Sequence, residues 1–326
     1  MRSLLFVPGD DEKKIVKALA TESDIIILDL EDSVAPTQKM KAAALVRDVL
    51  ETLSAEERKN CPQIYVRINP LGDGQAYKDI DMVLPGRPNG IVLPKCQSGS
   101  DAGKASEMLV RAESEIGVTT GTVKLIAIMT ETAGSLFGAG TYENAATRLI
   151  ALAWGAEDLS ADVGATATRG ADGHFLSPYM LARNLCLFGA AAAGLEPIDT
   201  VYVDFKNHKG LEEECAAALR DGFTGKMAIH PGQVPVINET FTPLKSSVAK
   251  ARAIVDGFAS AGNVGVIAID GEMVDKPHLV RAQKIIARAE LYGEKVDPKP
   301  KRKSTRRKTT AKRKPAAKRK SSAKKS

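Results

Sequence analysis

The chain has 326 residues, of which 44% are hydrophobic and 26% are charged, a composition typical of globular proteins and unlike that of fibrous or low-complexity chains. Its formal net charge of +6 is unevenly distributed, because residues 298–326 carry 15 Lys and Arg and no Asp or Glu. The rest of the chain holds 31 basic and 40 acidic side chains, a net charge of −9. We therefore expect an acidic folded body, long enough for one large α/β barrel with an appendage, and a separate cationic tail.

The sequence favours a reducing compartment. No apolar run approaches the roughly 18 residues of a membrane span. A strand is expected to begin at Ser3, which leaves no room for a signal peptide. The cysteines show none of the paired spacing of zinc or redox sites, so we expect small buried thiols in a cytoplasmic protein. They are Cys61, Cys96, Cys186 and Cys215.

Short apolar segments alternate with longer segments of helical periodicity, which is typical of βαβ units and a parallel sheet. Eight such strands by about residue 240 predict a TIM (β/α)₈ barrel. The alternative, a doubly wound open sheet, would carry a glycine-rich turn after its first strand, where this chain has only Val-Pro-Gly-Asp. The predicted strands are 3–7, 24–30, 63–68, 90–93, 125–130, 149–154, 200–203 and 226–229, and the predicted helices between them are 11–20, 38–53, 102–116, 134–146, 178–193 and 211–221.

The pattern changes after residue 240. A helix is predicted over 245–259, a short strand over 266–269 and a final helix over 277–291. This segment is too small to form an independent domain, so we interpret it as a lid or arm. We therefore divide the chain into a barrel (1–240), a C-terminal helical lid or arm (241–297) and a disordered tail (298–326), whose composition cannot bury enough apolar surface to fold.

Carboxylates follow two consecutive apolar strands of the predicted barrel. Glu131 ends one of them, and Glu157, Asp158 and Asp162 follow the next. The active site of such a barrel forms at the C-terminal ends of its strands. Mg²⁺ prefers oxygen ligands, takes one or two protein carboxylates and keeps several waters. The pattern therefore predicts a magnesium site, and the alternative is that Glu131 caps a helix while the other acids form a solvated turn.

Two cationic residues also lie at strand ends. Arg67 ends an otherwise apolar strand, and its planar guanidinium suits a substrate carboxylate or an enolate oxygen; the alternative is a structural pair with a neighbouring acid. Lys95 follows Leu-Pro at the end of another strand. A Schiff-base role is one interpretation of Lys95, but we favour a structural ion pair with Glu131 or Asp29.

Three further basic residues have two interpretations each. His230, which precedes a proline, is either a catalytic base or, as we favour, a hydrogen-bonded structural group. Lys13 and Lys17 are spaced i, i+4 and share one face of the first predicted helix. They either hold phosphate groups near the barrel mouth or belong to a solvated surface.

The residues gathered at the strand ends resemble those of the citrate lyase beta-subunit-like family, within the wider group of HpcH/HpaI-type aldolases, malyl-CoA lyases and malate synthases. The matching strings recur in order from residue 2 to about residue 290, so the resemblance covers everything but the tail. They are RSLLFVPG (2–9), DLEDSV (29–34), VRIN (66–69), VLPK (92–95), MTET (129–132), WGAEDL (154–159), IHP (229–231) and MVD (273–275).

The resemblance assigns expected roles by position. The magnesium ligands of the family fall on Glu131 and Asp158, and its arginine for the substrate carboxylate falls on Arg67. The catalytic aspartate of the malyl-CoA lyase-like members, which arrives on a lid from the neighbouring subunit of a trimer, falls on Asp275. Asp275 is alternatively the N-cap of the last predicted helix. Cofactor contacts of the CoA-using members fall on Phe6, Lys13, Lys17, Met227 and Ala228.

The activity implied by the resemblance is that of a Mg²⁺-dependent carbon–carbon lyase. It would split, or form, a 3-hydroxy-acyl-CoA thioester such as malyl-CoA or citramalyl-CoA, with an acyl-CoA and a 2-oxo acid as products, and it would assemble as a homotrimer or hexamer. Ala43, where relatives often carry Arg, and Phe6, where a close relative type has Tyr, leave the acyl carrier open. The alternatives are a citryl lyase beta subunit acting on an acyl-carrier-protein thioester and a malyl-CoA thioesterase.

The tail supports an alternative from another class of protein. Residues 312–320 resemble the tails of linker histones, and 15 cations without aromatic residues favour salt-dependent, sequence-independent binding of phosphates. The chain is alternatively a nucleic-acid-associated protein, or its tail is an accessory with no bearing on catalysis.

Overall fold

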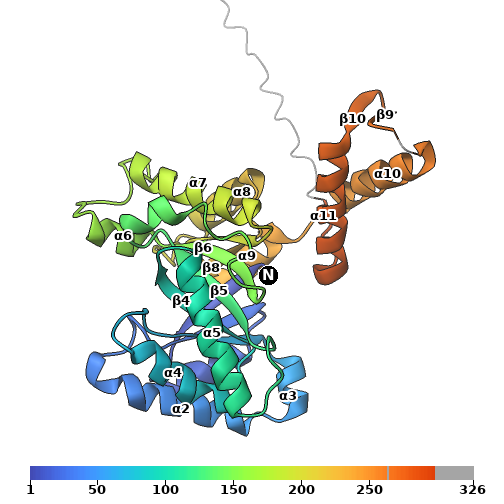
Figure 1. Cartoon of the computed structure of the whole chain (residues 1–326). Coiled ribbons are helices and arrows are strands. Elements are labelled where there is room, and N and C mark those ends of the chain that lie inside the picture. Colours follow the sequence, from blue (N-terminus) through green and yellow to red (C-terminus); the bar gives the residue numbers. More distant parts are fainter. Residues whose placement is uncertain (263, 298–326) are drawn as a thin grey trace, which may run out of the picture.

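The structure is a computed structural model that describes residues 1–262 and 264–297. Eight parallel strands close into a barrel in the order β1 to β8, with helices around it (Figure 1). The predicted TIM barrel is therefore confirmed. The strands are β1 (Ser3–Pro8), β2 (Ile25–Asp29), β3 (Gln63–Arg67), β4 (Gly90–Cys96), β5 (Lys124–Met129), β6 (Leu149–Trp154), β7 (Glu196–Asp199) and β8 (Gly225–Ala228).

Strand residues alternate between two apolar layers. In β2, Ile25 and Ile27 belong to a cluster inside the barrel, whereas Ile26 and Leu28 belong to the cluster between the strands and the helices. Because both faces of each strand are buried, both must be apolar. This explains why the strands have continuous apolar sequences rather than alternating ones.

The seventh strand lies at Glu196–Asp199, four residues before the predicted 200–203. The prediction was wrong because this strand ends on a carboxylate whose partners are remote in sequence. Asp199 is fully buried and accepts hydrogen bonds from Trp154 Nε1 at 2.8 Å and from Lys226 Nζ at 2.7 Å. A buried charge in a strand is tolerated when it is paired in this way.

The predicted helix over 134–146 is also wrong, since only a short 3₁₀ turn, η3 (Gly134–Gly138), forms there. Gly138 lies so close to the chain before α5 that a Cβ at this position would be 2.0 Å from the carbonyl oxygen of Gln97. Glycine also disfavours helix by about 1 kcal/mol per residue. The short helices α3, α4, α6 and α9 were not predicted. The barrel helices are α1 (Glu12–Leu19), α2 (Lys39–Thr52), α3 (Ala55–Asn60), α4 (Gln75–Val83), α5 (Gly99–Glu115), α6 (Ala156–Asp162), α7 (Ser177–Ala192), α8 (His208–Asp221) and α9 (Val234–Phe241), with 3₁₀ turns η1 (Pro36–Gln38), η2 (Leu84–Gly86) and η4 (Pro231–Gln233).

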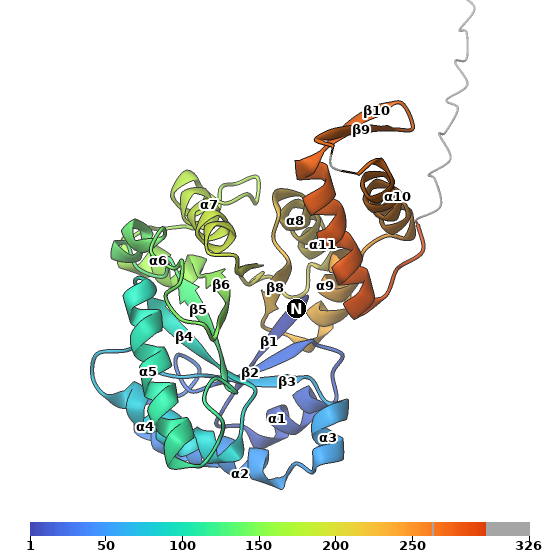
Figure 2. The same cartoon turned by 45° about the vertical axis from the view of Figure 1, so that its right-hand side comes forward.

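An arm follows the barrel and stands away from it (Figures 1 and 2). It has its own small core, in which Ile254, Phe258 and Val274 are buried together. The predicted strand β9 is present, and its antiparallel partner β10 was not predicted. The division of the chain near residue 240 and the role of the arm as a lid remain proposals, and the predicted disordered tail lies outside the described residues. The arm consists of α10 (Lys245–Ala261), β9 (Val266–Ile269), β10 (Glu272–Asp275) and α11 (Lys276–Tyr292).

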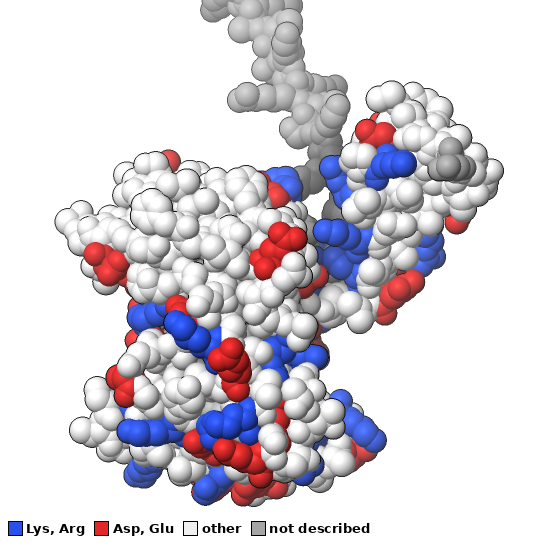
Figure 3. All heavy atoms as spheres, viewed as in Figure 1, with Lys and Arg blue, Asp and Glu red and all other residues white. Residues whose placement is uncertain are grey.

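Charged side chains are unevenly distributed over the face of the molecule that Figure 3 draws. Figure 3 shows charges of both signs mixed over the part formed by α2 to α5, and a largely uncharged surface over α6 and α7. Among the described residues, no helix combines the length and apolar character that a bilayer crossing needs.

Candidate active site

Arg67 is held at the end of β3 by carboxylates from the end of β2. Asp29 accepts from Arg67 Nε at 2.6 Å and from Nη2 at 2.8 Å, and Glu31 lies 2.8 Å from Nη1. Burial by itself would raise the pKa of Asp29, but the hydrogen bonds and charge of Arg67 hold it below its ordinary value. Such a two-point grip fixes the plane of the guanidinium. The structural pairing of Arg67 with neighbouring acids is thus present, and its Nη1 atom also lies near the exposed Asp32.

Lys95 contacts both predicted magnesium ligands. Its backbone has a left-handed conformation, with φ of 49°, where β4 breaks register with β5. Its backbone N–H donates to Glu131 Oε2, while its ammonium lies 3.0 Å from Asp158 Oδ1 and donates to Glu31. Lys95 does form ion pairs, as predicted. Its partners are Glu31, Asp158 and Asp32 rather than the side chains of Glu131 or Asp29.

The protonation of Lys95 argues against Schiff-base chemistry. Burial would lower the pKa of its ammonium, but Glu31 and Asp158 together raise it well above the ordinary value. A Schiff-base lysine must be a neutral amine to attack a carbonyl, which requires a lowered pKa. Lys95 therefore acts here as a fixed cation among carboxylates.

Glu131 is a buried carboxyl group beside a second carboxylate. Its side chain follows β5, after Thr130, which also has a positive φ. Burial, followed by the nearby charge of Asp158, raises the pKa of Glu131 to about 8. Gly155 makes room for it, because a Cβ at that position would lie 2.7 Å from Glu131 Cγ. The alternative in which Glu131 caps the next turn is not seen, since η3 has no side-chain cap.

This carboxylate pair fits a magnesium ion. Two neighbouring carboxylates of like charge are stabilised when they share a divalent cation. In the described ranges no cluster of three or more Asp, Glu, His or Cys side chains forms a cage for a metal, as expected for an ion that keeps several waters. Of the other acids after β6, Glu157 is exposed and Asp162 accepts a hydrogen bond from Ala133 N at 2.7 Å, so Asp158 remains the candidate ligand.

A cavity of about 440 Å³ opens at this barrel mouth. Phe6, Arg67 and Asp158 line it together with Val201 and Ile229. The guanidinium of Arg67 lies over the Phe6 ring, 4.8 Å from its centroid. The cavity therefore combines one cation, Arg67, with the carboxylates of Asp29, Asp32 and Asp158 and several apolar side chains.

The other predicted contact residues occupy different surroundings. Lys13 and Lys17 are exposed on α1, as either interpretation requires. Met227 faces the barrel interior and Ala228 the layer under the helices. His230 accepts a hydrogen bond from Gly232 N at 3.1 Å and stacks on Phe205, which agrees with the structural interpretation that we favoured.

Asp275 lies on the arm, at the N-terminus of α11. It caps this helix in a reciprocal box with His278, and the hydrogen bond from His278 lowers the pKa of Asp275. The capping interpretation is thus correct, and it does not exclude a second role. No contact in the described part of the chain joins Asp275 to Arg67, Glu131 or Asp158.

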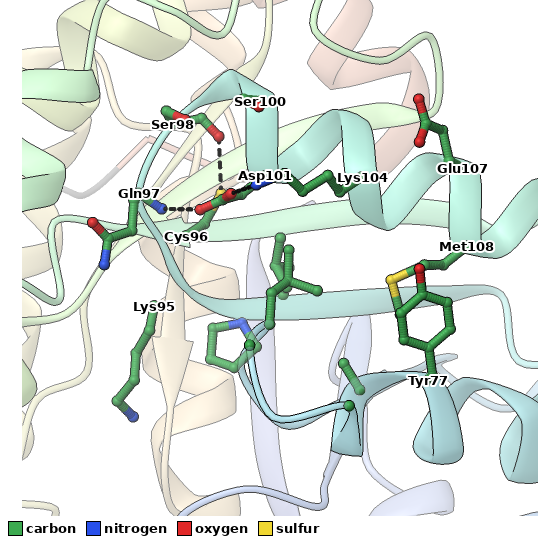
Figure 4. Close-up of a pocket in the computed structure, with 16 residues that line it drawn as sticks. Tyr77, Lys95, Cys96, Gln97, Ser98, Ser100, Asp101, Lys104, Glu107 and Met108 are labelled. Atoms are coloured by element: carbon green, nitrogen blue, oxygen red, sulfur yellow. Dashed lines mark hydrogen bonds and ion pairs between the residues drawn. The ribbon is translucent and has the colours of Figure 1, made fainter.

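A larger cavity, about 680 Å³, adjoins the site between α4 and α5 and was not predicted. Figure 4 shows Lys95 at one end of it and Tyr77 and Met108 at the other. Its rim includes Gly72 and Gly74, which both have positive φ. The glycine spacing in this loop is the only sequence signal that points to it.

Comparisons with known proteins agree with this geometry. The sequence model of HpcH/HpaI aldolase/citrate lyase matches residues 2–231. The chain is 31% identical to mitochondrial citramalyl-CoA lyase of Rattus norvegicus, covering 90% of this chain and 87% of that protein. It is also 31% identical to citrate lyase subunit beta of Escherichia coli K12, covering 90% and 94%.

The solved structures include CitE from Mycobacterium tuberculosis in complex with magnesium, acetoacetate and coenzyme A. It is 32% identical to this chain, with a TM-score of 0.69, and the match covers 89% of this chain and 98% of that one. Both the sequence and the fold match over most of their length. The chain therefore belongs to the HpcH/HpaI aldolase/citrate lyase family.

Proposed function

We propose that the chain is a Mg²⁺-dependent carbon–carbon lyase that cleaves, or forms, a 3-hydroxy-acyl-CoA thioester such as malyl-CoA or citramalyl-CoA. The observation that carries the proposal is that Arg67 and Asp158 line one small cavity, while Lys95 contacts both Asp158 and the buried Glu131. Relatives named as carbon–carbon lyases support it, as does a similar structure that holds magnesium and coenzyme A.

Each side chain of the site has a distinct role in such a cleavage. Glu131 and Asp158 would hold the magnesium ion, which would supply a Lewis acid to the 2-oxo acid. In cleavage, the bond between the α- and β-carbons of the thioester breaks, and its electron pair goes to the thioester as an enolate. The Nη1 edge of Arg67 would stabilise that oxygen, because Asp29 already holds the guanidinium in place. The 3-hydroxyl group loses its proton as its carbon becomes the carbonyl of the 2-oxo acid, and the carboxylate of Asp275 would accept that proton and return it to the α-carbon.

In this proposal the acyl group is carried by CoA rather than by an acyl-carrier protein. Lys13 and Lys17 are exposed on the helix after β1, near Phe6, and are free to meet the phosphates of a nucleotide. The alternatives are a citryl lyase that uses an acyl-carrier-protein thioester and a malyl-CoA thioesterase. We place the enzyme in the cytoplasm, a proposal supported by four cysteines without disulfides.

We also propose that the chain forms a homotrimer or hexamer in which the arm of one copy serves the cavity of another. The arm holds Asp275 away from its own barrel (Figure 2). The apolar side chain of Met273, two residues earlier, is 72% exposed, which suits a contact with a second subunit.

Substitution of a magnesium ligand tests the reaction. We expect Glu131→Gln to lower the release of a 2-oxo acid from a panel of 3-hydroxy-acyl-CoA esters by at least about 100-fold, because loss of an outer partner of a metal ligand alone costs up to that much. Asp162→Asn, with the same change at a nearby carboxylate that binds a backbone amide, is the matched control and should retain turnover. An inert panel combined with cleavage of citryl-acyl-carrier protein would favour the citryl lyase instead.

The pH dependence of metal binding follows from the raised pKa of Glu131, about 8. Below that pH the carboxyl group holds a proton, which must leave before it can bind a metal. The affinity for Mg²⁺ or Mn²⁺, measured by calorimetry, should therefore rise about tenfold per pH unit from pH 6 to 7.5 and level off above 8. A flat affinity over this range would contradict the assignment of Glu131.

A complementation experiment tests the role of Asp275. Asp275→Ser keeps an N-cap but removes the acid, so we expect α11 to stay folded while turnover falls by about 10² to 10⁴. Mixing this variant with inactive Arg67→Ala should restore part of the activity, since hybrid assemblies contain cavities with both groups. Full activity of Asp275→Ser would leave capping as its only role, and hybrids without activity would rule out sharing between subunits.

The tail supports a second, independent activity. Its 15 cations in residues 298–326, set against a body of net charge −9, favour binding of nucleic acid or another polyanion. A chain that ends at Asp297 should keep lyase turnover and lose salt-sensitive retention on DNA. Retention that survives truncation would exclude the tail as its cause.

A further inference from the structure

A third cavity, about 800 Å³, lies where the arm meets the barrel, and we call it the hinge cavity. Helices α8 and α9 line it from the barrel, the segment 242–244 closes one side, and α10 and α11 line it from the arm. In Figure 1, α11 is the element of the arm nearest to the barrel. It shares no residue with the cavity at the barrel mouth, so it is a separate site.

The lining of the hinge cavity is cationic. Arg220 from the barrel and Arg281, Arg288 and Lys295 from the arm contribute to it. In the part of the chain that the structure describes, none of the four lies within 4 Å of a carboxylate, whereas Arg252 on the same arm is ion-paired. This concentration of unneutralised cations stands out in a body whose net charge is negative.

Two carboxylates partly offset these cations. Glu212 and Glu239 also line the cavity, which leaves a charge of +2 within it. A ligand with at least two negative charges would therefore neutralise the site. Electrostatic attraction of this kind is strongest when the cations are already desolvated.

Arg288 is such a desolvated cation. Its Nη2 donates to the carbonyl oxygens of Thr224 at 2.8 Å and Phe241 at 3.0 Å, which fixes the guanidinium without neutralising it. Burial lowers the pKa of Arg288, whereas Arg67 and Arg111, which face carboxylates, have raised pKa values. The guanidinium is held in place before any anion arrives, which reduces the entropy lost on binding.

The rest of the lining is apolar. Leu219, Val236, Phe241, Leu244 and Ile285 contribute to it. A cavity of this volume with a few convergent charges on apolar walls is the usual form of a small-molecule site. The hinge cavity thus suits an organic molecule with anionic groups rather than an isolated inorganic ion.

We propose that the hinge cavity binds a small organic polyanion, with at least two phosphate or carboxylate charges, which bridges the barrel and the arm. Arg220 would hold it from the barrel side and Arg281 and Arg288 from the arm side. Binding would restrain the arm relative to the barrel. The proposal does not depend on the lyase activity.

Calorimetry on the full chain tests the site, with pyrophosphate and citrate as the two probes for phosphate and carboxylate chemistry. Arg67→Gln serves as the background, so that anions at the barrel mouth do not contribute. We expect Arg281→Gln and Arg220→Gln each to lower, at least tenfold, the affinity for whichever of the two probes binds more tightly to the background chain. Both side chains are exposed and have no carboxylate partner, so the fold should tolerate their loss. Lys284→Gln, an exposed cation on the same helix outside the cavity, is the matched control and should bind as the background does.

A second readout follows the arm itself. Lys245 begins α10 directly after the hinge segment, so the bound anion should slow tryptic cleavage there in the background chain and not in Arg281→Gln. Equal affinity in Arg281→Gln, Arg220→Gln and Lys284→Gln would overturn the proposal. It would also be overturned if neither probe binds and Arg281→Gln instead splits an oligomer in light scattering, because the cations would then face a second copy of the chain.

Discussion

The barrel mouth depends on one residue, Lys95, which fixes three carboxylates through its backbone and its side chain. Its backbone N–H holds Glu131, and its ammonium holds Asp158 and Glu31. The left-handed backbone at Lys95 is uncommon for a residue with a side chain, so the tertiary contacts on either side must maintain it. Without this cation, the acids from β2, β5 and β6 would repel one another in a buried position.

The remaining groups of the site are arranged around that cluster. Arg67 is fixed by Asp29 and faces the cavity over the ring of Phe6, so the cavity contains a fixed cation as well as the carboxylate of Asp158. Gly155 allows Glu131 to occupy the space beside Asp158. A small acid that carries both a carboxylate and a carbonyl is complementary to these groups. This agreement between geometry and family membership is what favours a carbon–carbon lyase.

The arm is a second structural unit beside the barrel. It has a small core of its own and holds Asp275 at the tip, away from the barrel that precedes it. At its base, Arg288 ties it to backbone carbonyls of the barrel and lines a cationic cavity. The position of the arm is therefore sensitive both to contacts at its tip and to any anion bound at its base. An active site shared between subunits and a polyanion bound in the hinge cavity would both affect the position of the arm relative to the barrel.

The sequence by itself determined the barrel, seven of its eight strands, and the placing of Glu131 and of the acids Glu157, Asp158 and Asp162 at strand ends, because buried strands must be apolar throughout and their ends must carry the polar groups. Only the tertiary structure decided where β7 lies, because the burial of Asp199 depends on Trp154 and Lys226, which come from other strands. It likewise decided that Lys95 pairs with Glu31 and Asp158, since a cation among several acids takes the partners that strand register and a left-handed turn bring within reach.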